Sequence, residues 1–286
     1  MNQERTQRLR EIAKELLTKG DVVEIIGYGE GRQNGKTVPV FVKTAAEAEK
    51  LIFDQRCANN LAVYLKFPQR RAQGAVGIVV KGCDLRSVIG LIQEFQLQRE
   101  TVKIIAVSCE GILGKNGHLL MKCQNCDVAN PTYCDFLVGE PVKLEKSVDF
   151  ADLLQKYEAM TPRERWDFWQ GEFQKCIKCY ACRQACPLCF CTRCIAEKNQ
   201  PPWIETSAHA RGNLAWNIIR AFHLAGRCAG CEACELACPM GIPLMLLNRK
   251  VEKEVFEYFQ YRAGVSPEVK PPFATFKMDD KGEFIL

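Results

Sequence analysis

Residues 176–187 read CIKCYACRQACP, and the same pattern returns at residues 228–239 as CAGCEACELACP. Each copy has the form C-x-x-C-x-x-C-x-x-x-C-P, in which three closely spaced thiolates hold one 4Fe-4S cube. When two copies occur together, the fourth cysteine of each run ligates the cube of the other copy. The repeat therefore predicts two clusters and requires the two segments to lie side by side.

This crossed pairing gives a definite ligand set for each cluster. The first set is Cys176, Cys179, Cys182 and Cys238, and the second set is Cys228, Cys231, Cys234 and Cys186. A zinc ribbon is the alternative, but it needs only two C-x-x-C pairs and leaves half of these thiols unused. We therefore expect a mostly α, two-cluster domain that resembles a bacterial ferredoxin.

The composition of the whole chain agrees with a metal-binding role for its cysteines. The chain has 286 residues, 47% of them hydrophobic and 26% charged, which predicts a globular protein of about two domains. Seventeen cysteines exceed what a core of this size requires, and their odd number argues against a complete disulfide set. The N-terminal stretch lacks the apolar block of a secretory signal, and no segment predicts a membrane span. We expect a cytoplasmic protein.

The charge pattern gives little support to nucleic-acid binding. Lys and Arg number 39 against 34 Asp and Glu, and the net charge is +5. The basic residues are scattered among acidic ones rather than gathered in a stripe. A nucleic-acid partner is therefore not predicted.

The first half of the chain predicts an α/β domain with a parallel βαβ core. Residues 74–82 and 102–108 are strand-like and β-branched, with a helical pattern between them, and residues 38–43 also predict a strand. Parallel sheets bind ligands beyond the carboxyl ends of their strands, and Cys83 and Cys109 each follow one of these strands. The two thiols are expected at one edge of the sheet.

A second group of cysteines completes this edge. Cys123 and Cys126 form a C-x-x-C near the end of the first half. If their loop folds over the sheet edge, four thiolates converge with Cys83 and Cys109, which suits a third 4Fe-4S cluster or a zinc ion. We favour the cluster, with Cys134 as a reserve ligand.

The other cysteines and a run of glycines leave alternatives open. Cys189, Cys191 and Cys194 exceed what two cubes require; they are candidates for an additional metal site completed by Cys57 or a partner, for redox thiols, or for buried packing residues. The stretch IGYGEGRQNGK at residues 26–36 lacks the spacing of a dinucleotide site. We favour a flexible loop there over contact with a phosphate or flavin.

These patterns divide the chain into four parts. Residues 1–145 form the α/β domain, and residues 146–172 form a helical connector. Residues 173–250 form the two-cluster domain with a helical insertion between its motifs. Residues 251–286 form a C-terminal helix and an extended tail that is available to lie across a cluster. No catalytic side chain is predicted, because no histidine and carboxylate arrangement suggests hydrolysis.

Three runs in the first half carry a resemblance to a known family. VVKGCDLRSVIGLIQE at 79–94, AVSCEGI at 106–112 and CQNCDVANPTYCDFLVGE at 123–140 resemble the core of the beta subunits of deazaflavin-dependent hydrogenases and formate dehydrogenases. The resemblance spans roughly residues 20 to 140. It implies that Cys83, Cys109, Cys123 and Cys126 hold a 4Fe-4S cluster beside a flavin.

The second half resembles a different electron carrier. AGRCAGCEACELACPMGIPL at 225–244 is similar to the second motif of the small iron-sulfur subunit of heterodisulfide reductase. The two resemblances together imply a subunit that relays electrons between a hydrogenase or formate dehydrogenase and a heterodisulfide-reductase-like flavoprotein. The alternative is a subunit with FAD that accepts hydride from a deazaflavin or NAD(P)H and passes single electrons to its clusters.

Overall fold

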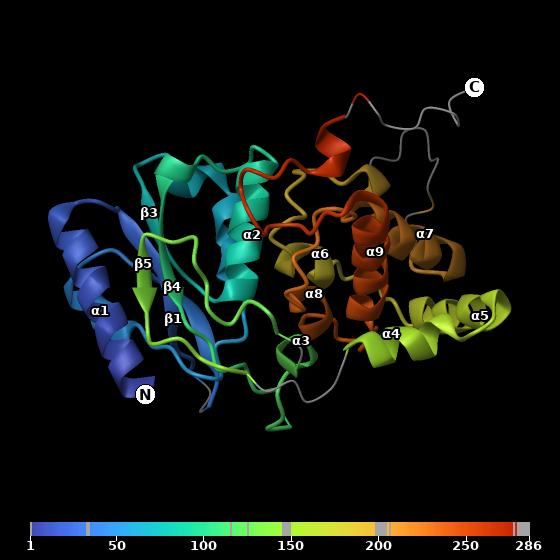
Figure 1. Cartoon of the computed structure of the whole chain (residues 1–286), viewed down its shortest axis with the longest axis horizontal. Coiled ribbons are helices and arrows are strands. Elements are labelled where there is room, and N and C mark those ends of the chain that lie inside the picture. The colour runs from blue at the N-terminus through green and yellow to red at the C-terminus, as the bar shows by residue number, and fades with distance from the viewer. Residues whose placement is uncertain are drawn as a thin grey trace.

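The computed structural model describes residues 2–32, 35–114, 116–124, 126–144, 150–197, 205, 207–276 and 278. All described strands lie in the first half of the chain, and the second half consists of helices and loops (Figure 1). The five-stranded sheet has the order β2-β1-β3-β4-β5. The α/β prediction for the first half is therefore confirmed.

The sheet is mixed but mostly parallel. Its strands are β1 (Glu24–Glu30), β2 (Thr37–Val42), β3 (Val76–Val80), β4 (Val102–Val107) and β5 (Phe136–Val138). Only β2 runs antiparallel to its neighbour β1, while β1, β3, β4 and β5 pair in parallel. Helix α2 (Gly82–Gln93) connects the parallel pair β3 and β4, so the predicted βαβ unit is present.

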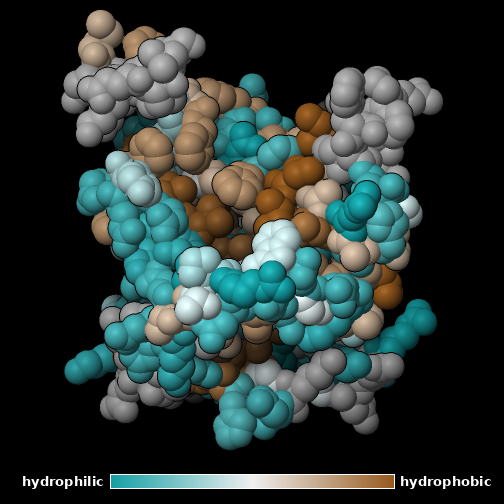
Figure 2. Space-filling model, turned by 90° about the vertical axis from the view of Figure 1, so that its right-hand side faces the viewer, coloured by the Kyte–Doolittle hydropathy of each residue, from teal (hydrophilic) through white to brown (hydrophobic). Residues whose placement is uncertain are grey.

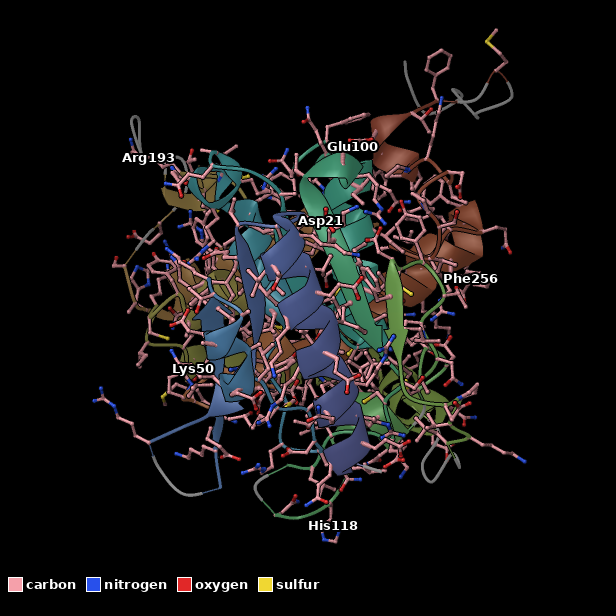
Figure 3. The ribbon with its side chains drawn as sticks, turned by 90° about the vertical axis from the view of Figure 1, so that its left-hand side faces the viewer. Asp21, Lys50, Glu100, His118, Arg193 and Phe256 are labelled. Atoms are coloured by element: carbon pink, nitrogen blue, oxygen red, sulfur yellow. The ribbon has the colours of Figure 1, made fainter. Side chains whose placement is uncertain are left out.

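Helices cover both faces of the sheet. Helix α1 (Asn2–Lys19) lies across one face and α2 lies on the other (Figures 1 and 3). Leu9, Ile12, Ala13 and Leu16 follow a helical period and are buried, because this stripe of α1 faces the sheet. Short 3-10 turns complete the chain: η1 (Ala46–Lys50), η2 (Leu61–Lys66), η3 (Pro68–Arg71), η4 (Arg99–Thr101), η5 (Ile195–Glu197) and η6 (Pro272–Ala274).

The glycine-rich stretch is a strand over much of its length, so the prediction of a flexible loop was wrong for Gly27 and Gly29. Both residues belong to β1. A Cβ atom on Gly27 would lie 2.3 Å from Cδ2 of Leu51, and one on Gly29 would lie 2.6 Å from Cγ1 of Val40. The missing side chains let β2 and the η1 segment pack closely against the strand.

The second half is built from helices. They are α4 (Phe150–Glu158), α5 (Pro162–Gln174), α6 (Ala181–Ala185), α7 (Ala210–His223), α8 (Ala233–Leu236) and α9 (Leu244–Phe259), whereas the short helix α3 (Met121–Gln124) belongs to the first half. Helix α5 starts at a capping box in which Thr161 and Glu164 bond to each other's main-chain N–H groups. Trp169 of this helix stacks on Phe173 and donates to Tyr157, which joins α5 to α4.

The chain after α9 returns to the first half. Gln93 of α2 donates to the main-chain oxygens of Ser266 and Val269, and Arg86 of α2 donates to that of Ala263. The predicted tail is described only in part, since residues 279–286 lie outside the described residues. The segment from Ala263 to Val269 packs beside α2 (Figure 1).

None of the helices in the described ranges has both the length and the apolar character that crossing a bilayer would require.

Candidate metal centres

Three cavities in the structure are each lined by four cysteines. Cavity A has a volume of about 330 Å³ with its open mouth included, and its cysteines are Cys176, Cys179, Cys182 and Cys238. Cavity B has the same volume, and its cysteines are Cys186, Cys228, Cys231 and Cys234. Cavity C has a volume of about 490 Å³, and its cysteines are Cys83, Cys109, Cys123 and Cys126. The structure thus brings together each of the three sets of four that the motifs predict.

Cavities A and B are shaped by one backbone turn that occurs twice. Lys178 and Gly230 occupy matched positions of the two motifs and have φ values of 51° and 64°. Tyr180 and Glu232 are the next matched pair, with φ values of 59° and 63°. Left-handed backbone costs a residue with a side chain about 1–2 kcal/mol, so the surrounding structure must hold these turns in place.

The two short helices that follow these turns connect the two cavities. Helix α6 contains Cys182 of cavity A and ends just before Cys186 of cavity B. Helix α8 contains Cys234 of cavity B and is followed by Cys238 of cavity A. Because α6 and α8 pack against each other, the fourth cysteine of each motif reaches the other motif's cavity.

Cavity C forms where two parallel strands end. Val80 of β3 pairs with Ala106 of β4, so both strands end at one edge of the sheet, and Cys83 and Cys109 follow them there. Gly82 is required at this edge, because a Cβ atom on it would lie 1.6 Å from the main-chain oxygen of Val128. Because Gly82 has no Cβ atom, the loop that carries Cys126 can close over the strand ends.

A buried polar group supports this edge from within the sheet. The Nζ of Lys81, which lines cavity C, donates to Oδ2 of Asp84 at 2.6 Å and to the hydroxyl of Tyr28. All three side chains are almost fully buried. Burial opposes the charge of Lys81, but the carboxylate of Asp84 outweighs it and raises the pKa of the amine. The amine of Lys81 therefore stays charged beside cavity C, paired with the carboxylate of Asp84.

The thiols of cavity C are poor anions unless a cation binds them. Burial raises the pKa of Cys83, Cys109 and Cys126, and it raises the pKa of Cys123 to about 11. A metal that takes these sulfurs as thiolates must displace their protons, so burial favours a strongly bound cation over free thiolates.

Main-chain N–H groups supply the compensation that metal-bound sulfur needs. The sulfur of Cys109 accepts from Gly111 and that of Cys126 from Val128. The same spacing of two residues, from the sulfur to its main-chain donor, recurs in cavity B. The N–H of Gly230 donates to Cys228, and the N–H of Ala233 donates to Cys231. Such donors stabilise thiolates, and hydrogen bonds to sulfur tune iron-sulfur potentials, so this donor set fits iron-sulfur ligation.

The remaining cysteines do not line these cavities. Cys189 hydrogen-bonds to Cys186, which lowers the pKa of Cys186 and raises that of Cys189. Cys191 is exposed and Cys194 is partly buried. Cys57 is buried in the core of the first half and Cys134 is partly buried. Within the described ranges, no three His, Cys, Asp or Glu side chains lie close enough together to hold a single metal ion.

Sequence reasoning missed the polar face of α7. Asn213 donates from Nδ2 to the main-chain oxygen of Cys176 at 2.7 Å, and Arg220 donates from Nη2 to that of Cys182 at 3.2 Å. Asn213, Asn217 and Arg220 are buried together and recur at helical spacing. This polar stripe on the buried face of a helix between the two motifs was the signal that the helix holds the cysteine loops.

Cavities B and C share a wall and are built by both halves of the chain. Ala229 lines both cavities. Ser87 of α2 lines cavity B, while Gly230 and Arg249 from the second half line cavity C. Since α6 and α8 join A to B and Ala229 joins B to C, the three cavities form a row with B in the middle.

Comparison with known proteins identifies relatives of one kind. No family model matches the chain. Over 133 residues the chain is 34% identical to the F420-dependent formate dehydrogenase subunit beta of Methanocaldococcus jannaschii. This match covers 46% of this chain and 33% of that protein. It is 22% identical over 355 aligned positions to the F420-dependent formate dehydrogenase 1 subunit beta of Methanococcus maripaludis, covering 90% of each. The first match thus spans about one third of its relative.

A solved structure gives a weaker likeness. A chain of the F420-reducing NiFe hydrogenase complex from Methanosarcina barkeri matches with a TM-score of 0.32 and 18% identity, over 38% of this chain and 39% of that chain. Both named sequence relatives are beta subunits of redox enzymes, the kind of subunit that the first half resembles.

Proposed function

We propose that this chain is an iron-sulfur electron-transfer subunit of a redox complex. It relays electrons between a hydrogenase- or formate-dehydrogenase-type partner and a heterodisulfide-reductase-like flavoprotein. The observation that carries the proposal is the row of three cavities, each lined by four cysteines. The names of the sequence relatives, both beta subunits of F420-dependent formate dehydrogenases, support it.

In this proposal the twelve cysteines of the three cavities each hold iron in a 4Fe-4S cluster. Such clusters supply one-electron transfer when bound. The residues of the chain hold the iron as thiolates, donate main-chain N–H groups to sulfur and exclude water through burial. The shared wall at Ala229 keeps the second and third centres close to each other.

Cavity A is the end of the row that reaches the surface of the second half. Cys179, one of its cysteines, is exposed, and the lining residues Ile177 and Met240 are 56% and 39% exposed. Figure 2 views the end of the molecule formed by α5 and α7, where apolar residues gather in a hollow ringed by polar ones. Exposed apolar side chains beside a surface centre suit docking of a redox partner.

A second candidate is a flavin-containing subunit that accepts hydride from a deazaflavin or NAD(P)H. The names of the two sequence relatives, both F420-dependent enzymes, favour it. Gly27 and Gly29 of the glycine-rich stretch do not fit a flavin contact, because they face Leu51 and Val40 at packing distance. We therefore assign no residue to FAD and rank electron relay first.

The test is a full cofactor analysis of the chain purified without oxygen. We expect about twelve irons with matching acid-labile sulfide, because each 4Fe-4S site holds four. About eight irons together with zinc would show that cavity C holds zinc rather than a cluster. Stoichiometric FAD would favour the second candidate. A folded, colourless protein without iron would overturn the proposal. Purification with native partners then identifies the donor and the acceptor.

A further inference from the structure

We propose that Arg220 and Lys122 set the reduction potentials of the three centres, by placing one buried positive charge at each junction of the row. Arg220 serves the junction between cavities A and B, and Lys122 serves that between B and C. This inference rests on the proposed function, because it requires clusters in the three cavities.

Arg220 of α7 lies between cavities A and B. Its side chain lines cavity B, and its Nη2 donates to the main-chain oxygen of Cys182, whose thiol belongs to cavity A. The residue is only 5% exposed, and its Nε is buried without a hydrogen-bond partner. A buried guanidinium with a vacant donor between two cysteine cavities is the arrangement expected where anionic centres supply the partner.

Lys122 occupies the matching position between cavities B and C. It belongs to α3, lines cavity C and is 9% exposed. Its Nζ donates at 2.8 Å to the main-chain oxygen of Cys231, whose thiol belongs to cavity B. The only bond that joins it to a carboxylate, within the described ranges, runs from its main-chain N–H to Glu232.

Neither cation has a carboxylate partner for its side chain among the residues that the structure describes. The carboxylate of Asp84, which is close to cavity C, is already paired with Lys81 at 2.6 Å. A buried cation without a counter-charge is costly. A 4Fe-4S cluster with four thiolates carries net negative charge, so clusters on both sides would balance Arg220 and Lys122.

The positive charges of Arg220 and Lys122 must then also affect the midpoint potentials of the clusters. Adding an electron to a cluster makes it more negative, and a nearby cation stabilises that state in a buried environment of low dielectric constant. Removing a cation therefore lowers the midpoint potential of the clusters next to it. The order of the cavities predicts which clusters are affected. Arg220 raises the potentials of the clusters in A and B, and Lys122 raises those in B and C.

The experiment uses the full chain, purified without oxygen, and follows each centre in a redox titration by electron paramagnetic resonance. Signals are assigned by their loss in Cys179→Ser, Cys231→Ser and Cys126→Ser. The charge-removing variants are Arg220→Gln and Lys122→Gln, and the charge-keeping variants are Arg220→Lys and Lys122→Arg. Arg211→Gln, an exposed change on the same helix α7, is the matched control.

We expect Arg220→Gln to lower the midpoint potentials of A and B and leave C unchanged. Lys122→Gln should lower those of B and C and leave A unchanged. The charge-keeping variants should stay near the parent, and Arg211→Gln should move none. Loss of iron in a glutamine variant, with retention in its charge-keeping counterpart, also supports a counter-charge role.

Two results would overturn the inference. One is a glutamine variant with full iron and unchanged potentials, and the other is a charge-keeping variant that shifts as far as the glutamine variant. These results are distinct from failure of the proposed function, which shows first as missing iron in the unaltered chain.

Discussion

The Nζ of Lys122 donates to the main-chain oxygen of Cys231 at 2.8 Å, across a sequence separation of 109 residues. Lys122 directly precedes a cysteine of cavity C, and Cys231 is a cysteine of cavity B. The bond therefore ties together two cysteine loops from opposite halves of the chain. Their relative position is set by a direct contact rather than by a flexible linker.

The crossed ligand sets can be tested with single cysteines. Cys182→Ala and Cys238→Ala should remove the same cluster, although the residues lie in different motifs, because both line cavity A. Cys186→Ala should remove the other cluster, although Cys186 is close to Cys182 in sequence. Each variant should lose about four irons. Mössbauer and paramagnetic resonance spectra identify the lost centre, and different losses in the first two variants would refute the pairing.

Gly82→Ala should disturb cavity C. The added Cβ would lie 1.6 Å from the main-chain oxygen of Val128, so the loop carrying Cys126 must move. We expect a lower unfolding temperature and lower iron content at this site. The control is Gly171→Ala in α5, where nothing lies within 4 Å and the better helix propensity should stabilise by about 0.5–1 kcal/mol. Full occupancy of the site in Gly82→Ala would contradict the prediction.

Glu252 should stabilise the contact between α9 and α2 in a pH-dependent way. Burial alone would raise its pKa, but Arg249 and Arg86 outweigh burial and lower it. A lowered pKa means that the stabilisation is present above the unfolded value near 4.5 and is lost as the pH falls through the folded value. Glu252→Gln should cost about 3 kcal/mol at neutral pH, because it leaves Arg86 without its carboxylate.

The measurement for Glu252 is the difference in unfolding temperature between the parent and Glu252→Gln, followed anaerobically to acid pH. This difference should shrink below a pH of about 4.5 as the carboxylate becomes protonated. Glu254→Gln is the control on the same helix, since its pair with Lys250 is more exposed and is worth at most about 1 kcal/mol. A difference that is constant across the range would show that the charge of Glu252 is not involved.

Gln93→Leu should release the segment that follows α9. The Gln93 amide donates to the oxygens of Ser266 and Val269 and accepts from the N–H of Gly264. Losing these bonds leaves the buried N–H of Gly264 and two partly buried main-chain oxygens unpaired, and a buried unsatisfied group costs about 1–3 kcal/mol. We expect faster proteolysis and faster hydrogen exchange in residues 261–269. Gln96→Ala, an exposed change in the turn after α2, should leave both rates unchanged.

Local patterns were enough to predict the βαβ unit and the grouping of the cysteines, but not strands β1 and β5. The β-branched runs that became β3 and β4 flank a helical period that became α2, so the βαβ unit could be read directly. The failure at Gly27 and Gly29 has a physical cause. Glycine indicates flexibility only where nothing packs against it, and Leu51 and Val40 pack against these two. Such contacts depend on segments that the local sequence does not place.

The supporting residues of the site were beyond sequence reasoning for the same reason. Lys122 and Arg220 are ordinary basic residues in the sequence, and neither belongs to a cysteine motif. Their importance follows from burial and from contacts with Cys231 and Cys182, which lie far away in the chain. The cysteine spacing specifies which thiols meet, whereas long-range packing specifies which charges surround them.

The shared wall at Ala229 has a consequence for engineering. A chimera that replaces the second half with a stand-alone ferredoxin would lose Gly230 and Arg249, which border the first half's own cysteine cavity. A fragment cut near residue 145 would likewise expose that cavity on one side. The two halves are therefore not interchangeable modules, and any transplant must carry the boundary residues of both.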